Sequence, residues 1–143
     1  MDTVKDILKY KGVNYYWISQ DDLAINALQK MSEKDIGALI VLEKGKMIGI
    51  FSERDYARKM VSMGKSCDGL KVSDMMSKKV YYVTPETSVN DCMTLMTDKH
   101  IRHLPVLDNN DIAGMVSIGD LVNNIIYQQK SMITSLENYI IGV

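Results

Sequence analysis

The sequence has few of the features that mark secreted, membrane-spanning or nucleic-acid-binding proteins. Two cysteines in 143 residues, Cys67 and Cys92, are too few for a disulfide framework. No run of about 18 apolar residues is present to cross a bilayer, and Met1–Lys11 is charged where a signal peptide needs an apolar segment. The net charge is −1, with scattered lysines and arginines. We therefore expect a cytoplasmic protein without a membrane or nucleic-acid partner.

Signatures of catalysis and of metal binding are missing as well. The sequence has no serine or cysteine nucleophile paired with a recognisable base, no zinc signature and no glycine-rich phosphate loop. His100 and His103 are three residues apart, but a helix should end between them and no further ligand lies at metal spacing. Cys67 has only Lys65 as a basic neighbour, which favours an ordinary thiol over a redox switch. We expect neither enzyme activity nor a metal site.

What the sequence does contain is a tandem repeat. When Tyr15–Met60 is moved forward by 65 positions, it aligns without a gap on the second half of the chain. The identical pairs include Tyr16 with Tyr81, Met31 with Met96, Lys34 with Lys99, Leu39 with Leu104, Gly49 with Gly114, Ser52 with Ser117 and Asp55 with Asp120. A repeat of roughly 60 residues is marginal alone, so we expect two similar halves that share an interface around a pseudo-twofold axis.

Hydrophobic periodicity predicts the same elements in each half. A short helix and a strand come first, then a helix with apolar residues at i, i+3, i+4 and i+7, a β-hairpin and a last helix. In the first half we expect a helix at 4–10, a strand at 15–18, the helix of Ala24 to Met31, strands at 38–42 and 47–51, and a helix from Ser52. In the second half we expect a helix at 72–76, a strand at 80–83, a helix begun by Thr84–Thr87, strands at 103–107 and 112–116, and a helix from Ser117. We predict an α/β fold of two β-α-β-β-α repeats, each a three-stranded sheet with helices on one side, packed sheet to sheet.

We place the first repeat at residues 1–62 and the second at 72–130. The linker between them, 63–71, contains Gly64, Ser66, Asp68 and Gly69 and has no periodicity. Residues 131–143 are predicted to form an extra C-terminal helix. The apolar residues that keep helical spacing there are Met132, Ile133, Leu136 and Ile140. Because the repeat unit leaves this surface without a partner, we expect a homodimer.

The pattern Gly-x-x-Ser-x-x-Asp occurs in both halves, where the hairpin enters the last helix. Its members are Gly49, Ser52 and Asp55, and again Gly114, Ser117 and Asp120. The free N–H groups of a helix N-terminus favour an anion, while aspartate can accept hydrogen bonds from ribose hydroxyls. Glycine lets a flat ring or another backbone come close. The pattern suits a nucleotide, but Ser-x-x-Asp is also a helix-capping arrangement, so both interpretations stay open.

The paired motifs occur together with Thr84-Pro85 and with the strand Ile101-Arg102-His103-Leu104-Pro105-Val106. With these features the chain resembles a pair of cystathionine-β-synthase (CBS) domains, an arrangement called a Bateman module. The resemblance covers about Val4–Ile126. The resemblance implies a regulatory module that requires no cofactor and binds AMP, ADP, ATP, NAD or S-adenosylmethionine in clefts between the repeats. It also implies signalling to an effector protein in trans. By the same resemblance, the two aspartates hold ribose, the two serines lie on the phosphate side, and Thr84 with Ile101–Leu104 forms the wall around the base.

The two motifs have different neighbours. Where the second repeat has Arg102, His103 and Pro105, the first has Gly37, Ala38 and Ile40, and Ser19-Gln20 replaces Thr84-Pro85. The first repeat instead has Arg54, Arg58 and Lys59, which form either a phosphate cradle or a solvated helix face. We hypothesise that the Asp120 site holds base and ribose best. The candidate ligand-binding residues are Ser19, Gly37, Ala38, Gly49, Ser52, Arg54, Asp55, Arg58, Thr84, Ile101, Arg102, His103, Leu104, Pro105, Gly114, Ser117 and Asp120.

Two alternative functions compete with nucleotide sensing. The chain could be an interaction module that has kept the fold but not the ligand. It could also be a redox regulator of a thioredoxin-like or other enzyme partner, as some stand-alone CBS-pair proteins are. Nucleotide that co-purifies with the protein would separate sensing from both alternatives, and a partner pull-down would separate the alternatives from each other.

Overall fold

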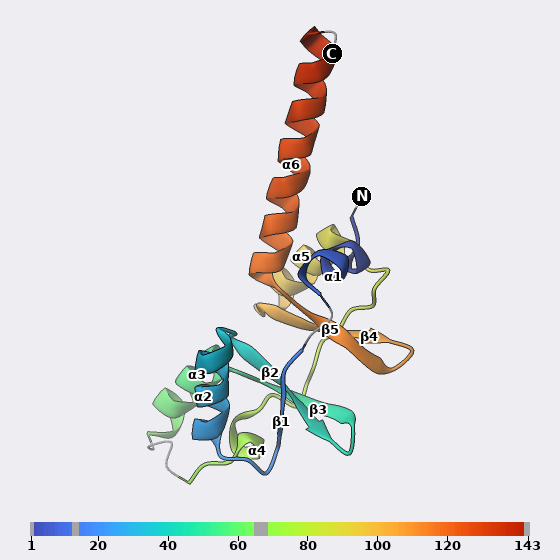
Figure 1. Cartoon of the computed structure of the whole chain (residues 1–143). Helices are drawn as coiled ribbons and strands as arrows, with labels where there is room; N and C mark the ends of the chain where they lie inside the picture. Colours follow the sequence, from blue (N-terminus) through green and yellow to red (C-terminus); the bar gives the residue numbers. More distant parts are fainter. Residues whose placement is uncertain (1, 13–14, 65–68, 142–143) are drawn as a thin grey trace. The chain divides into compact units, whose positions relative to one another are not determined.

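The structure is a computed structural model that describes residues 2–12, 15–64 and 69–141. Its contacts gather into two compact units whose elements are labelled in Figure 1. Unit 1 consists of Met1–Val13, Val83–Asp108 and Ala113–Val143, and unit 2 of Asn14–Tyr82 and Asn109–Ile112. Neither unit is a continuous half of the sequence, because the beginning of the chain joins the unit that carries the second motif.

Unit 2 is built on a three-stranded sheet in the order β1-β2-β3. Strand β1 (Trp17–Ser19) pairs in parallel with β2 (Ala38–Glu43), and β2 pairs antiparallel with β3 (Lys46–Ser52). Lys44 and Gly45 join β2 to β3 with φ of 50° and 77°, the backbone of a tight hairpin turn. The three-stranded sheet predicted for the first repeat is therefore confirmed.

The core of unit 2 lies where its helices cover the sheet. These helices are α2 (Ala24–Lys34), α3 (Glu53–Met63) and α4 (Val72–Met75). The buried residues of the core are Ile18, Ala24, Ala27, Met31, Leu39, Val41, Phe51, Val72, Met75 and Met76. The α2 members follow the predicted helical spacing, and the β2 members alternate as expected for one face of a strand.

Unit 1 contains a two-stranded sheet, β4 (His103–Asp108) with β5 (Asp111–Ser117). The predicted third strand at 80–83 is wrong in extent, because only Val83 forms a parallel bridge, to Val106. The N–H of Val83 donates to the Pro105 carbonyl at 3.0 Å, and the N–H of Leu107 donates to the Val83 carbonyl at 2.9 Å. The ladder goes no further because prolines stand where it needs its next N–H donors, Pro105 for the Tyr81 carbonyl and Pro85 for the Leu107 carbonyl.

The second helix of this repeat also begins later than predicted. Thr84–Thr87 form a turn, with the N–H of Thr87 donating to the Thr84 carbonyl at 3.1 Å. Helix α5 (Val89–Lys99) starts after Ser88, whose hydroxyl accepts from the N–H of Asp91 at 3.0 Å. A serine with a free hydroxyl at this position is a strong N-cap, which explains the boundary.

The first helix, α1 (Val4–Lys11), packs in unit 1 and not with the strands that follow it in sequence. The N–H groups of Val4 and Lys5 donate to the carbonyls of Thr87 and Pro85, both at 2.9 Å. Its apolar face is buried there through Val4, Ile7 and Leu8. Periodicity predicts the helix but carries no information on its partner, so this placement could not be read from the sequence.

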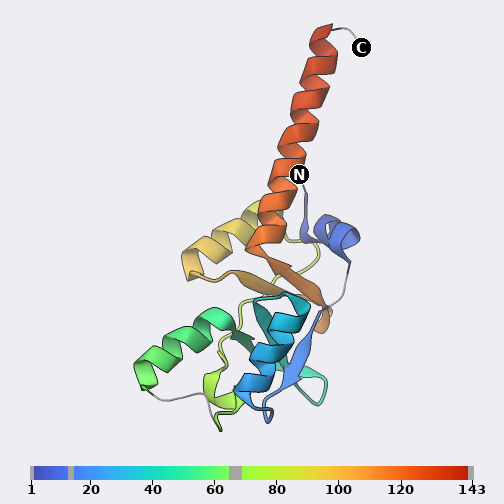
Figure 2. The same cartoon turned by 60° about the vertical axis from the view of Figure 1, so that its left-hand side comes forward.

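The last helix, α6 (Ile118–Ile141), is continuous, so the tail predicted at 131–143 extends the helix of the second repeat without a break through Ile141. Leu121 is its one buried residue among those described, and every residue from Ile126 to Ile141 is exposed. Figures 1 and 2 show this part of α6, drawn in orange and red, standing clear of the other elements of unit 1. The repeat boundaries predicted at residues 62, 72 and 130 are not tested by these units and stay predictions.

Candidate functional site

In unit 1, the serine and aspartate of the motif cap helix α6. The Ser117 hydroxyl accepts from the N–H of Asp120 at 3.2 Å, and Asp120 Oδ2 accepts from the N–H of Ser117 at 2.8 Å. The N–H of Ile118, the first residue of the helix, donates to the Arg102 carbonyl at 2.9 Å. Capping is thus confirmed for this motif, and two first-turn N–H groups that could have faced a phosphate are already bonded.

Lys11 of α1 binds the same carboxylate oxygen. Its Nζ lies 2.7 Å from Asp120 Oδ2 and 2.8 Å from the Met115 carbonyl oxygen. The two side chains are 34% and 22% exposed, so the ion pair is in contact with solvent. Among the described residues nothing donates to the second oxygen of Asp120, Oδ1. This oxygen is therefore open to a ligand hydroxyl.

Sequence reasoning missed Lys11. It lies 109 residues before Asp120, on a helix whose partner the periodicity could not predict. In the structure α1 packs beside α6, with its last turn at the first turn of α6. A lysine in the last turn also suits the negative end of its own helix.

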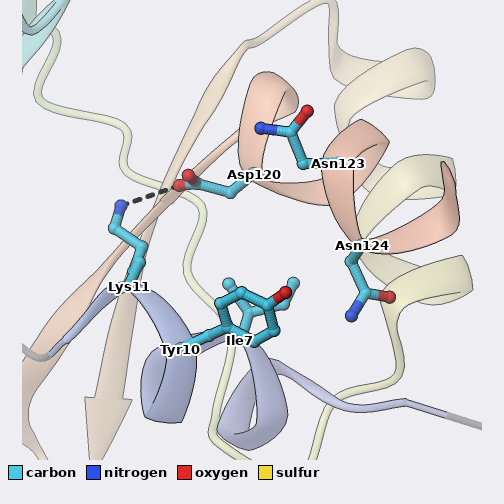
Figure 3. Close-up of a pocket in the computed structure, with 6 residues that line it drawn as sticks. All are labelled: Ile7, Tyr10, Lys11, Asp120, Asn123 and Asn124. Atoms are coloured by element: carbon cyan, nitrogen blue, oxygen red, sulfur yellow. Dashed lines mark hydrogen bonds and ion pairs between the residues drawn. The ribbon is translucent and has the colours of Figure 1, made fainter. Parts of the chain in front are cut away.

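Lys11 and Asp120 line a pocket between α1 and α6 (Figure 3). Ile7, Tyr10, Lys11, Asp120, Asn123 and Asn124 form its wall, and its volume is about 130 Å³. Small-molecule pockets usually measure roughly 300–1,000 Å³. The pocket therefore has room for one group of a larger ligand, such as a sugar or a phosphate, and offers it a carboxylate, a cation and two amides.

His103 of β4 belongs to the same electrostatic environment. Burial lowers its pKa below the ordinary 6.5, the charge of Asp120 opposes this shift, and the charges of Lys11 and Arg102 reinforce it. The structure thus brings His103, Ser117 and Asp120 close to one another, with the Arg102 carbonyl at the start of the same helix, and a ligand role for these residues stays a prediction. At neutral pH His103 is uncharged, so it offers a ligand a hydrogen-bonding ring and not a second cation.

The other predicted residues of the second repeat have mixed exposure. Leu104 and Pro105 are buried, and Leu104 is part of the chain's apolar core. Ile101 is half-buried and Thr84 is exposed, with its hydroxyl oxygen 3.2 Å from that of Thr87. Gly114 is buried with φ of 156°, a conformation that other residues rarely adopt. Exposure therefore favours Thr84 and Ile101 over Leu104 and Pro105 as ligand contacts.

In unit 2, the motif caps helix α3 but leaves its carboxylate open. The Ser52 hydroxyl accepts from the N–H of Asp55 at 3.1 Å, and the N–H of Glu53 donates to the Gly37 carbonyl at 3.1 Å, as Ile118 does to Arg102. No described residue donates to the half-buried Asp55 carboxylate. The two motifs therefore share their backbone geometry and differ in what their aspartates bind.

Gly49 is required by the chain's own backbone. A Cβ at this position would lie 2.8 Å from the Ser77 carbonyl oxygen and 2.9 Å from Met76 Sδ. Ser77 bridges to Ile50 of β3, with N–H to carbonyl distances of 2.8 and 3.0 Å. Of the two roles expected for this glycine, a close approach by a ring or by a backbone, the backbone approach is confirmed.

The cations of the first repeat have different surroundings. Lys59 Nζ donates to the carbonyls of Met75 and Met76 at 2.7 and 3.0 Å and so caps the C-terminus of α4. Arg58 is exposed and Arg54 half-buried. The Ser19 hydroxyl accepts from the N–H of Asp21 at 3.2 Å, Gly37 is half-buried, and Ala38 is buried. Lys59 therefore has a structural partner, and for Arg54 and Arg58 the choice between a phosphate cradle and a solvated helix face stays open.

The other sequence candidates give little chemistry. Cys92 is buried on α5, where burial and then the charge of Asp91 raise its pKa to about 11, so its thiol stays protonated and unreactive. Cys67 lies outside the described residues. Within residues 2–12, 15–64 and 69–141, no three histidine, cysteine or acidic side chains gather as a metal site requires. No helix in the same ranges is long and apolar enough to span a membrane.

Comparison with known proteins agrees with this architecture. The family model described as CBS domain matches residues 4–62 and 72–127, most of the chain. The chain belongs to the CBS domain family. CBS pairs are generally regulatory ligand-binding modules, and CBS proteins of this kind are regulatory rather than catalytic.

The similar proteins are stand-alone CBS-domain proteins. The chain is 39% identical over 149 positions to the CBS domain-containing protein CBSX3, mitochondrial, of Arabidopsis thaliana, covering 98% of this chain and 72% of that protein. It matches the solved structure of a putative signal-transduction protein with CBS domains from Burkholderia ambifaria MC40-6 with a TM-score of 0.85 and 44% identity, over 89% and 96% of the two chains. A hexameric CBS-CP12 protein from bloom-forming cyanobacteria matches with a TM-score of 0.74 and 25% identity, over 84% and 70%.

Proposed function

We propose that this CBS pair senses an adenosine-containing nucleotide, AMP, ADP, ATP or NAD, and signals its occupancy to an effector protein in trans. The observation that carries the proposal is the polar set around Asp120. Oδ1 of this carboxylate has no donor among the described residues, Lys11 lies at its other oxygen, and the neutral ring of His103 is nearby. A ribose needs an acceptor for its hydroxyls, a phosphate needs a cation, and this set supplies both.

The ligand can bind without breaking the helix cap. Ser117 and Lys11 both donate to Oδ2 of Asp120, so a ribose hydroxyl can donate to Oδ1 while the cap stays intact. At Asp55 no residue in the described part of the chain donates to either oxygen, but Lys59, one of the cations that follow it, is held by α4. We therefore assign the tighter site to Asp120, with Asp55 as the weaker one.

Lys11 offers a route from the ligand to the rest of the molecule. It is on α1, and its Nζ is held by Asp120 and by the Met115 carbonyl. A bound phosphate competes with these two acceptors for the ammonium group. Occupancy then shifts the population between attached and released positions of α1, which is a change that a partner protein can read.

We further propose that the protein is a homodimer in the cytoplasm. The exposed apolar residues of α6 support self-association, and a hexameric relative supports assembly of CBS pairs in general. The similarity to a putative signal-transduction protein of Burkholderia ambifaria supports a role in trans. Because the Arabidopsis relative is described as mitochondrial, the compartment is best tested by fractionation with a tagged chain.

A second candidate is an interaction module that has lost its ligand, with or without a thioredoxin-like partner. It is favoured by the fact that both motif serines act as caps and that Gly49 is covered by the backbone of Ser77. The redox form of this candidate would need a reactive thiol, which Cys92 does not supply.

Calorimetric titration of the chain with AMP, ATP, NADH and S-adenosylmethionine tests the proposal. We expect saturable binding of at least one of the adenine nucleotides. A companion titration uses Lys11→Met, which keeps the length of the side chain and removes its charge. This variant should weaken AMP about five- to tenfold and leave adenosine unchanged, since adenosine has no phosphate. If all four ligands at millimolar concentration give heats no larger than those of dilution, the proposal is rejected and the interaction module remains as the function.

A further inference from the structure

The distal half of α6 has an apolar face that nothing in unit 1 covers. Ile133 is 55% exposed, Leu136 56% and Ile140 79%, and all belong to one long helix. Exposed apolar residues scattered singly are ordinary on a soluble protein, but a continuous stripe along a projecting helix marks an interaction surface.

The stripe has a heptad pattern. Ile126, Ile133 and Ile140 recur every seven residues, and Gln129 and Leu136 follow the first two after three. These are the a and d positions of a coiled coil, the positions at which one helix packs against another. Over Ile126–Ile141 the pattern runs for roughly 24 Å at 1.5 Å per residue. The natural partner for such a seam is therefore another helix.

The two flanks of the seam differ. One flank carries the apolar residues Met132 and Tyr139, and the other carries Lys130 and Glu137. Lys130 and Glu137 are seven residues apart, or about 10.5 Å along the axis, which is too far for an ion pair within one helix. Their charges are opposite, so each could pair with its counterpart on a second copy.

We propose that α6 pairs antiparallel with α6 of a second copy, with Ile133 of one helix opposite Leu136 of the other. In an antiparallel pair, a positions face d positions, and each flank meets the same flank of the partner. This register places Lys130 beside Glu137 of the second copy, twice by symmetry. It also places Met132 beside Tyr139.

A parallel pair of the same seam lacks this complementarity. Parallel helices bring opposite flanks together, so Lys130 would lie beside Ile125 and Glu137 beside Met132 of the second copy. Both charges would then face apolar neighbours without an ion pair. Charge complementarity therefore selects both the occupant, a second copy of this chain, and its direction. This inference deepens the proposed homodimer by giving its contact surface.

The first test is the mass of the intact chain by sedimentation equilibrium at micromolar concentration. We expect the wild-type chain to self-associate, and Leu136→Asp to raise the Kd of this step at least a hundredfold. Asn138→Asp is the matched control, because it introduces the same side chain on the opposite face of α6 and should change the Kd less than twofold. A monomeric wild type, or a mass that Leu136→Asp leaves unchanged, would overturn the proposal.

The second test isolates the register with exposed residues that do not affect folding of the units. Lys130→Glu should raise the Kd about five- to tenfold in low salt, because it places two carboxylates together at both ends of the seam. Adding Glu137→Lys to this variant should restore the wild-type Kd within twofold. If the double variant self-associates with the same Kd as Lys130→Glu alone, the antiparallel register is rejected. Neither readout involves a nucleotide, so failure here is distinct from failure of the proposed ligand.

Discussion

In both units a serine at the end of a hairpin caps the following helix, and the first N–H of that helix donates to a carbonyl just before the hairpin. The aspartates three residues on differ. Asp120 closes the capping box and holds Lys11, whereas no described residue donates to the carboxylate of Asp55. The role of the serine is set by residues next to it in sequence, while that of the aspartate depends on a helix from the far end of the chain.

This comparison explains why a symmetric motif gives asymmetric sites. The charge beside Asp120 comes from α1, which joins unit 1, and unit 2 has no equivalent lysine on its own short helix α4. The lysine of unit 2 that does reach across, Lys59, binds carbonyl groups and not the motif carboxylate. The repeat thus duplicates the backbone scaffold and not its electrostatic setting.

The largest effect on stability that we expect is that of an alanine at Gly49, compared with an alanine at Gly119. Gly49→Ala should lower the free energy of unfolding by about 2–3 kcal/mol, because the new Cβ would lie within 3 Å of the Ser77 backbone. Gly119→Ala is the control, because its Cβ would meet only Ser117 Oγ at 3.6 Å. Urea denaturation measures both. Equal midpoints for the two variants would show that the backbone contact at Gly49 is not tight.

A smaller effect should separate the cations of α3. Lys59→Met should lower the free energy of unfolding by about 1–2 kcal/mol, because two carbonyl groups at the end of α4 lose a charged donor. Arg58→Met, on the exposed side of the same helix, should change it by less than about 0.5 kcal/mol. Nucleotide affinity should be the same in Lys59→Met as in the wild type. A loss of affinity there would instead support a phosphate cradle that includes Lys59.

The smallest effect is the pH dependence due to His103. Its folded pKa lies below 6.5, so on acidification from pH 6.5 the unfolded chain takes up a proton before the folded one does. Stability should therefore fall in this window and be unaffected above it. His103→Gln, which cannot titrate, should flatten this part of a curve of unfolding free energy against pH. An unchanged slope would place His103 in a more solvated environment than the structure shows.

Most of the fold could be predicted from the sequence, because the repeat and its periodicity are local signals. The hairpins, the α2 and α5 faces and both serine caps belong to this group. The placement of α1 and the loss of the strand before Val83 could not, because they depend on which segments meet in space. Lys11 was missed for the same reason. At Gly49 the motif allowed a close approach either by a ring or by another backbone, and the position of Ser77 shows that the backbone is close.

The central claim is that the Asp120 carboxylate binds a nucleotide in addition to capping helix α6. It is tested most directly by the calorimetric affinity of Asp120→Ala and Asp55→Ala for whichever of AMP, ATP and NADH binds the wild type most tightly. Loss of the ribose acceptor should weaken binding about ten- to a hundredfold in Asp120→Ala and less than threefold in Asp55→Ala. If Asp120→Ala instead loses about 1 kcal/mol of stability and binds with unchanged affinity, or if the two variants lose affinity equally, the account is contradicted.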